Sequence, residues 1–194
     1  MPVYRDSYCH CVSEDDRRHW DARFAEGGLA PLGDHGPPPG FTSAPHLLPS
    51  EGSAIDVACG RGRASVWLAE RGMQVTGIDV SPVAIELARE LARLSGVADR
   101  CRFEVHDLDY GLPDGPQVDL VFCHLFRDMR LDQAIIDRTA RGGMVAVATL
   151  SEVDAGPGRF RAPPGELHEA FGSLEVLAEG EADGIAWLIG RKHG

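Results

Sequence analysis

Long apolar runs, dense basic clusters and a cysteine framework are all missing from this sequence of 194 residues. No apolar run approaches the roughly 20 residues that a membrane-spanning helix needs, and the N-terminus does not resemble a signal peptide. The 19 Lys and Arg residues against 30 Asp and Glu residues give a net charge of −11. We therefore expect a soluble protein that has no membrane partner and binds neither nucleic acid nor a polyphosphate.

The five cysteines are odd in number and scattered along the chain. Cys59, Cys101 and Cys123 fall inside apolar strand patterns, where a reduced thiol is buried easily. The pattern favours a cytoplasmic protein without a disulfide framework. Cys9-His10-Cys11 has no second ligand pair at zinc-finger spacing, so we predict no metal site.

The most informative stretch is a short apolar strand that opens into a glycine turn, Ala54-Ile55-Asp56-Val57-Ala58-Cys59-Gly60-Arg61-Gly62-Arg63. Glycines let a ligand approach bare backbone, and the following helix, residues 64–71, offers free N–H groups at its start. A second strand, residues 73–79, ends at Asp79, 17 positions after Gly62. A nucleotide-binding fold places its ribose-binding carboxylate at about this spacing. The two acids around one glycine loop therefore indicate a nucleoside ligand.

From residue 53 onward, strand and helix patterns alternate. Ser81 and Pro82 begin a helix that runs to about residue 95, and a further helix is predicted over residues 131–139. Strands are predicted over residues 101–106, 118–123, 144–149, 173–178 and 185–189, the last two flanking a Glu-Ala-Asp-Gly turn signal. The prediction is a doubly wound α/β fold, with a mostly parallel seven-stranded sheet, helices on both faces and a C-terminal antiparallel hairpin.

We expect a single domain over residues 1–194, with a core at 51–150 and a substrate-side segment and closing hairpin at 151–194. The first fifty residues differ in composition from the rest. Ser13 is placed to cap a helix that Gly27 and Gly28 end, and seven of the ten residues from 31 to 40 are Pro or Gly. That segment is expected to form an extended cover.

The motifs resemble those of the class I S-adenosylmethionine-dependent methyltransferases over about residues 51–150. They are, in family order, residues 56–62, Gly77-Ile78-Asp79-Val80-Ser81, His106-Asp107-Leu108, residues 118–123 and the Gly142-Gly143 turn. Residues 20–24 and 159–167 are similar to the small-molecule branch, which includes tellurite-resistance-type and thiopurine-type enzymes. The resemblance implies transfer of a methyl group from S-adenosylmethionine to a small molecule by in-line displacement.

The resemblance also implies roles for individual residues. The cofactor-binding set would be Asp56, Ala58, Cys59, Gly60, Gly62, Asp79, Val80, Asp107, Leu108 and Cys123. Backbone around Gly60 would contact the methionine part, Asp79 the ribose and Asp107 the adenine amino group. Asp56 is equally well explained as a strand-end acid bonded to loop N–H groups.

His124 follows the fourth strand, at the edge of the sheet where α/β proteins bind ligands. It is our candidate general base, although a packing or loop-anchoring imidazole is a simple alternative. Trp20, Arg23 and Arg161 are predicted on the substrate side, and Arg127 is expected on the surface. Asp119 and His106 are expected to have structural roles.

Two other functions compete with methyl transfer. A nicotinamide-dependent oxidoreductase would use a similar sheet, but its Gly-X-Gly-X-X-Gly fingerprint requires glycine at position 65, which is serine here. A regulator that binds S-adenosylmethionine without catalysis would carry the same motifs, because those motifs report donor binding and not turnover.

Overall fold

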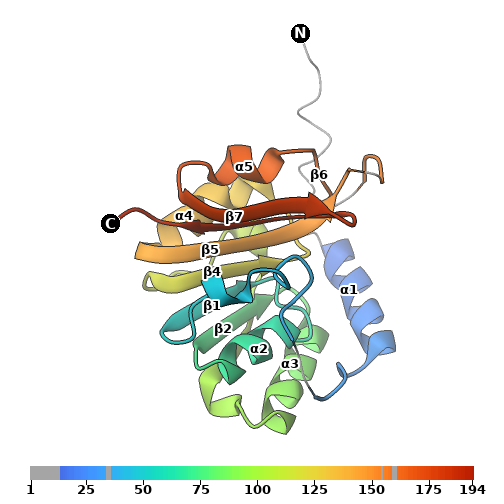
Figure 1. Cartoon of the computed structure of the whole chain (residues 1–194). Helices are drawn as coiled ribbons and strands as arrows, with labels where there is room; N and C mark the ends of the chain where they lie inside the picture. The colour runs from blue at the N-terminus through green and yellow to red at the C-terminus, as the bar shows by residue number, and fades with distance from the viewer. Residues whose placement is uncertain (1–13, 34–35, 154, 159–160) are drawn as a thin grey trace.

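The computed structural model describes residues 14–33, 36–153, 155–158 and 161–194, and its centre is one sheet with the strand order β3-β2-β1-β4-β5-β8-β7 (Figure 1). The strands are β1 (Ser53–Val57), β2 (Gln74–Asp79), β3 (Cys101–Val105), β4 (Val118–His124), β5 (Thr139–Ser151), β6 (Arg161–Ala162), β7 (Glu175–Ala182) and β8 (Ile185–Arg191). β1 to β5 run parallel to one another, and β8 pairs antiparallel with both β5 and β7. The predicted seven strands are confirmed, and the two-residue β6 adds an eighth beside β5.

Five α-helices accompany the sheet: α1 (Glu14–Gly27), α2 (Arg63–Glu70), α3 (Pro82–Leu94), α4 (Asp132–Arg138) and α5 (Glu166–Phe171). Alternate strand residues feed two buried clusters, one on each face of the sheet. The first cluster contains α2, α3 and the chain around Phe41 and Leu48. The second contains α4 and α5. Helices therefore lie on both faces, as the apolar strand runs predicted.

Local signals explain the start of α3 and the end of α1. Ser81 accepts a hydrogen bond from the Ala84 N–H at 3.0 Å, which caps α3. Gly28, with a φ of 56°, donates its N–H to the Phe24 carbonyl and ends α1. The predicted Ser13 cap and Cys9-His10-Cys11 lie outside the described residues.

Asp119 has the structural role predicted for it. Its carboxylate accepts hydrogen bonds from the N–H and the hydroxyl of Ser53 at 2.7 and 2.9 Å, which joins the start of β4 to the start of β1. These bonds lower the pKa of Asp119. These bonds fix the register of β1 and β4, and therefore the relative positions of the carboxyl ends of the two strands.

Two strands extend well beyond their predicted bounds, and one helix was not predicted. β7 continues to Ala182, because the hairpin turn is a two-residue turn at Asp183 and Gly184, with φ values of 55° and 74°. β5 starts at Thr139 instead of Met144. The predicted Gly142-Gly143 turn therefore lies within β5, at an irregularity in its pairing with β4. Helix α5 was not predicted, because its six residues are too few to show helical periodicity. Within the described residues, no helix has the length and hydropathy that a membrane span requires.

Candidate functional site

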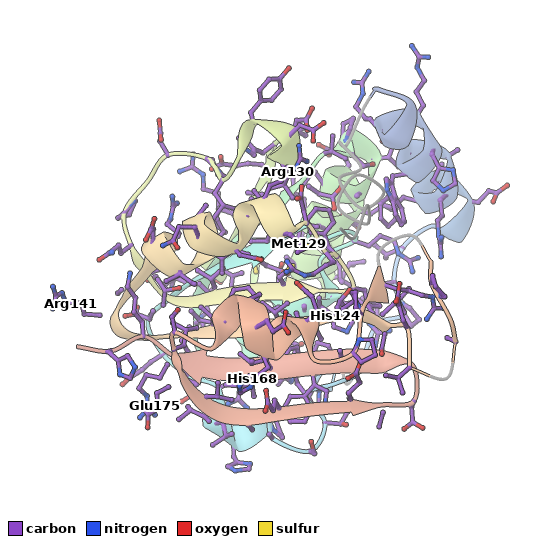
Figure 2. All side chains as sticks on the ribbon, turned by 90° about the horizontal axis from the view of Figure 1, so that it is seen from above. His124, Met129, Arg130, Arg141, His168 and Glu175 are labelled. Carbon is purple, nitrogen blue, oxygen red and sulfur yellow. The ribbon has the colours of Figure 1, made fainter. Side chains whose placement is uncertain are left out.

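A cavity of about 930 Å³ lies at the carboxyl ends of β1, β2, β4 and β5, between the sheet and α1. Figure 2 labels His124, which lines it from the end of β4. The other lining residues are His19, Trp20, Arg23, Phe24, Glu26, Gly27, Ala58, Cys59, Gly60, Arg61, Asp79, Val80, Leu108, Leu125, Phe126 and Leu150. Open α/β sheets bind their ligands at this edge, so this cavity is the candidate site.

The loop between β1 and α2 brings bare backbone to the cavity. Its conformation is left-handed at Ala58, Gly60 and Gly62, where φ is 55°, 52° and 78°. A Cβ built at Gly60 would point at the Phe24 ring, 3.5 Å away, so glycine here keeps open the space between loop and α1. Gly62 has a different role, since a Cβ there would lie 2.7 Å from the Cβ of Ala88 in α3.

Asp79 is held at the end of β2 by backbone groups on both sides of its carboxylate. Gly60 donates its N–H to one oxygen and Ser81 donates its N–H to the other, each at 2.9 Å. Burial raises the pKa of Asp79; the bonds from Ser81 and Gly60 oppose that shift, and the charge of Asp21 adds to it. Asp79 as a whole is only 7% exposed, and it lines the cavity.

Asp56 points the opposite way, into the core beneath α2. It accepts a hydrogen bond from the Ser65 hydroxyl at 2.5 Å and is 1% exposed. Burial raises its pKa to about 7, the Ser65 bond opposes the shift and nearby Asp79 adds to it. Asp56 is therefore an acid within the core that joins β1 to α2.

His124 contacts the cover predicted from the proline and glycine content. Its Nε2 lies 3.1 Å from the Pro39 carbonyl oxygen, and its ring packs near Phe41, with centroids 6.4 Å apart. Burial lowers the pKa of His124 to about 4; the Pro39 bond opposes this shift, and the charge of Arg63 adds to it. The imidazole is therefore neutral at pH 7.

Helix α1 forms the roof of the cavity and is tied down at two points. The Arg61 guanidinium donates to the Gly27 and Gly28 carbonyls at 2.9 and 2.7 Å, where α1 ends. Near the middle of the helix, Asp21 accepts a hydrogen bond from the Ser81 hydroxyl.

Two aromatic rings of α1 face the cavity. Trp20 and Phe24 stack with ring centroids 5.6 Å apart, and the Arg23 guanidinium lies 5.2 Å from the centre of the Trp20 ring. All three residues line the cavity, so the roof is aromatic with one cation beside it.

Comparison with known proteins agrees with this arrangement. A model of the methyltransferase domain family matches residues 54–141, from β1 into β5, the region that builds the cavity floor. Over these residues the chain carries a methyltransferase domain of the class I S-adenosylmethionine-dependent kind.

The sequence is similar to the probable chloroplastic tocopherol O-methyltransferase of Oryza sativa subsp. japonica. The two are 32% identical over 123 residues, which cover 60% of this chain and 34% of that protein. The chain spans between 17% and 40% of the lengths of four such curated relatives.

Two solved structures share the fold of this chain. The DhpI complex with S-adenosylhomocysteine is 22% identical, with a TM-score of 0.66, and the match covers 93% of this chain and 96% of that one. The [4+2]-cyclase SpnF is 18% identical, with a TM-score of 0.72, and the match covers 95% and 97%.

Most residues that the methyltransferase motifs suggested lie at the cavity. Those that line it are Trp20, Arg23, Ala58, Cys59, Gly60, Asp79, Val80, Leu108 and His124. Asp56, Gly62, Asp107, Cys123 and Arg161 do not line it. The Asp107 carboxylate accepts the Asp109 N–H at 3.0 Å and caps a short helical turn, and the Arg161 guanidinium donates to the Ser151 carbonyl at 2.6 Å. Cys123 is buried and donates its thiol to the Phe126 carbonyl.

Several lining residues had no signal in the sequence. Leu125, Phe126 and Leu150 reach the cavity because β4 and β5 end side by side, a juxtaposition fixed by register. Arg61 could have been suspected from its place between two loop glycines, but its bonds to α1 depend on the roof helix. Leu125 has a φ of 58°, an uncommon conformation for a branched residue and one that accompanies functional loops.

The expectation that Arg127 lies on the surface is wrong. Its side chain is 7% exposed and binds Asp132 and Glu166 together, with Nη1 2.5 Å from Asp132 and Nε 2.9 Å from Glu166. Burial alone would lower the pKa of Arg127, but the two carboxylates outweigh it and raise the pKa. This buried ion group joins the loop after β4 to α5, so Arg127 cannot reach the cavity.

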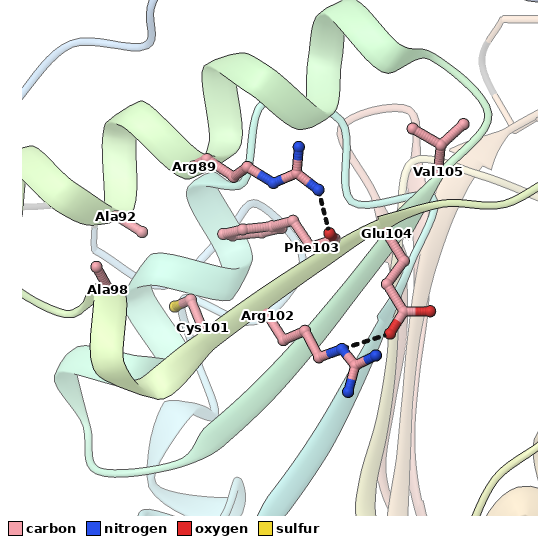
Figure 3. A pocket seen from close by; sticks show the side chains of 8 residues that line it. All are labelled: Arg89, Ala92, Ala98, Cys101, Arg102, Phe103, Glu104 and Val105. Atoms are coloured by element: carbon pink, nitrogen blue, oxygen red, sulfur yellow. Dashed lines mark hydrogen bonds and ion pairs between the residues drawn. The ribbon is translucent and has the colours of Figure 1, made fainter.

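A second hollow, of about 760 Å³, lies beside the edge strand β3 (Figure 3). It is lined by Arg89, Ala92, Ala98, Cys101, Arg102, Phe103, Glu104 and Val105. Arg89 donates to the Phe103 carbonyl at 2.7 Å, and Arg102 pairs with Glu104 at 2.7 Å. Its charged groups are thus already paired with neighbours, and it lacks the converging loops of the main cavity. Within the residues described, no group of three or more side chains is arranged to hold a metal ion.

Proposed function

We propose that this chain transfers a methyl group from S-adenosylmethionine to a small-molecule acceptor within the cavity under α1. One observation carries the proposal. The Gly60 backbone, the Asp79 carboxylate, Val80, Leu108 and the His124 imidazole all line a single cavity at the carboxyl ends of parallel strands.

The residues at the cavity floor suit the nucleoside of this donor. Each oxygen of Asp79 accepts one backbone N–H and retains a lone pair for a ribose hydroxyl. Val80 and Leu108 offer apolar surface to an adenine ring, and the open backbone at Gly60 suits the methionine part. The DhpI complex, which holds S-adenosylhomocysteine on the same fold, supports this placement.

The bound donor would supply a sulfonium methyl group that is already activated for displacement. The residues of this chain then have to orient the acceptor and exclude water, which can lower a barrier by roughly 7–11 kcal/mol. Trp20 and Phe24 in the roof, with Leu125, Phe126 and Leu150 at the strand ends, supply an apolar enclosure for that purpose.

A small organic acceptor fits this enclosure better than a nucleic acid. The cavity is roofed by a helix fastened at two points, and the net charge of −11 repels phosphates. Similarity to a tocopherol O-methyltransferase supports the same choice. We place the activity in the cytoplasm, in keeping with the free thiols of Cys59, Cys101 and Cys123.

Calorimetry with S-adenosylhomocysteine and, separately, NADH tests donor binding. We expect S-adenosylhomocysteine to bind and NADH not to. Asp79→Asn should weaken binding about 10- to 100-fold, because a charge-assisted bond contributes about 1.5–3 kcal/mol. Asp99→Asn, at an exposed position outside the cavity, is the matched control and should bind like the parent. Unchanged affinity in Asp79→Asn would contradict the placement.

Turnover requires its own measurement, because SpnF shows that the fold also hosts a cyclase. A panel of phenols, thiols, amines and carboxylic acids, with bulk RNA as an additional arm, is incubated with S-adenosylmethionine and analysed for methylated product by mass spectrometry. A methylated small molecule is the expected result. Methylated RNA would refute the small-molecule assignment, and donor binding with no product in any arm would favour a regulator.

A further inference from the structure

Residues 38–41, at the end of the Pro/Gly-rich cover, pack against the sheet. We call these residues the cover segment. Phe41 is fully buried, with its ring centroid 5.0 Å from that of Phe122 and 6.3 Å from that of Trp187. Gly40 has a φ of 91°, and a Cβ there would lie 3.2 Å from the Cβ atoms of both Ala148 and Trp187. The cover segment therefore has one well-defined position against β4, β5 and β8.

This position brings the Pro39 carbonyl to His124. A carbonyl oxygen can only accept a hydrogen bond, so the contact of 3.1 Å requires a hydrogen on Nε2 of His124. The ring is neutral at pH 7, because burial lowers its pKa to about 4. A neutral imidazole carries one N–H only, so Nδ1 is left as a bare acceptor. Among the described residues, no hydrogen bond to Nδ1 is found.

We propose that the cover segment is a positioning device for His124: the Pro39 carbonyl holds the imidazole in its Nε2–H form, and Nδ1 accepts the hydrogen bond of the acceptor's O–H or S–H. His124 then touches the substrate, whereas Gly40 and Phe41 act through it by fixing Pro39. The substrate part of this inference rests on the proposed function, but the tautomer does not.

The burial of His124 also limits the chemistry that it supports. Protonation of Nδ1 would create an imidazolium beside Phe41 and near the Arg63 cation, which the surroundings oppose. Nδ1 therefore orients the nucleophile and polarises its bond to hydrogen. The bond from the nucleophile to the methyl carbon would form as the sulfur–methyl bond breaks, S-adenosylhomocysteine would leave with the electron pair on sulfur, and the proton would pass to solvent as the product departs. Acceptors whose own O–H or S–H ionises easily suit such a site, and aliphatic alcohols do not.

The tautomer can be measured directly on the full chain labelled with ¹⁵N-histidine, using long-range ¹H–¹⁵N correlation spectra at pH 8. We expect a protonated Nε2 and a bare Nδ1 for His124, whose signals are assigned by their loss in His124→Gln. His106 is an internal reference, because its Nε2 also lies 2.8 Å from a carbonyl oxygen, that of Gly111, away from the cavity. An Nδ1–H form of His124 would overturn the inference.

A pair of glycine substitutions tests the role of the cover segment. Gly40→Ala should displace it, because the new Cβ meets two side chains, and the His124 pKa should move from about 4 toward 6.5 with a mixture of tautomers. Gly33→Ala introduces comparable backbone strain at a φ of 122°, but its Cβ would meet nothing within 4 Å, so the His124 signals should not change. Unchanged tautomer and pKa in a folded Gly40→Ala protein would refute the positioning role.

The same samples separate this inference from the proposed function. S-adenosylhomocysteine is added to each protein, and its affinity should be the same in Gly40→Ala as in the parent, since the cover segment does not line the cavity. Failure of the parent to bind this nucleoside would refute the proposed function while the tautomer result stood. The reverse pattern, donor binding with an Nδ1–H imidazole, would refute the inference alone.

Discussion

Ala58 holds a left-handed backbone conformation, with a φ of 55°, at the position where β1 turns into the glycine loop. An L-residue pays roughly 1–2 kcal/mol for this conformation, and glycine does not. The entropy that glycine adds to the unfolded chain cancels part of the gain. We expect Ala58→Gly to increase the free energy of unfolding by about 1 kcal/mol, measured by urea denaturation.

The same exchange at Ala92, within α3, provides the control. Ala92 is helical, so Ala92→Gly should decrease the free energy of unfolding by about 1 kcal/mol. Loss of stability in both variants would show that the Ala58 backbone is not strained.

Asp56 makes a pH-dependent contribution to the free energy of unfolding, and replacing its carboxyl group by an amide isolates that contribution. Its pKa is about 7 in the folded protein, compared with an ordinary value of 3.8, so the folded state binds a proton more tightly between those values. The stability contributed by this proton is present below pH 4 and is lost as the pH rises through 7. Asp56→Asn removes this loss and retains an acceptor for Ser65.

Relative to the parent protein, Asp56→Asn should therefore gain stability between pH 4 and pH 7, by at most about 1.4 kcal/mol per pH unit. Urea denaturation of both proteins at several pH values measures the difference. The His124 contribution, which has the opposite sign over a similar window because its pKa is lowered, cancels in that difference. A constant difference across this range would mean that Asp56 is ionised in the core.

The loop after β4 depends on the buried group of Arg127, Asp132 and Glu166, in which one cation serves two carboxylates. Arg127→Met leaves both carboxylates buried without a cation, and we expect it to cost about 3–5 kcal/mol of unfolding free energy. Thermal and urea denaturation measure the loss. Arg93→Met, in the exposed pair with Glu90, is the control and should leave the unfolding midpoint close to that of the parent. Equal effects of the two variants would contradict the buried arrangement.

The edge strand β3 has a backbone carbonyl group that a side chain of α3 covers. His106 donates its N–H to Asp79 in β2, so by alternation the backbone groups of Phe103 face the open edge. The Arg89 guanidinium donates a hydrogen bond to the Phe103 carbonyl oxygen, as Figure 3 shows. An edge strand whose N–H and C=O groups are exposed can form hydrogen bonds with the edge strand of a second copy.

We therefore expect Arg89→Ala to self-associate in a concentration-dependent manner, detected by sedimentation velocity. Arg93→Ala, one turn further along α3, controls for the loss of a surface charge. If Arg89→Ala sediments like the Arg93→Ala control at every concentration, Arg89 does not prevent pairing at the edge of β3.

The elements that could be predicted are those with a strong local signal. The glycine loop, the acid at position 79 and the apolar strands follow from residues adjacent in sequence, and the structure places them as expected. The buried state of Arg127 could not be predicted, because its partner Glu166 lies 39 residues away in a helix with no periodicity. The contact of Pro39 with His124 joins residues 85 positions apart, and no local rule specifies it.

Helix α1 is joined to the same two elements that hold Asp79, the glycine loop after β1 and the start of α3. It is held by Asp21 against the start of α3 and by Arg61 against the glycine loop, the two places where Asp79 also has its backbone partners, Ser81 and Gly60. The roof and the Asp79 carboxylate, for which we propose the ribose-binding role, are therefore mechanically connected. A ligand gripped by Asp79 and covered by Trp20 would stabilise both.

This connection predicts how the fold responds to the donor product. At 100 times its dissociation constant, a ligand that binds only the folded state adds about 2.7 kcal/mol, which for a chain of this size raises the melting temperature by about 5–10 °C. We expect that shift with S-adenosylhomocysteine, together with slower amide exchange in α1. In Asp79→Asn at the same concentration both effects should be smaller, because fewer sites are filled. A full shift in melting temperature without slower exchange in α1 would mean that the ligand binds the sheet edge and leaves the roof unaffected.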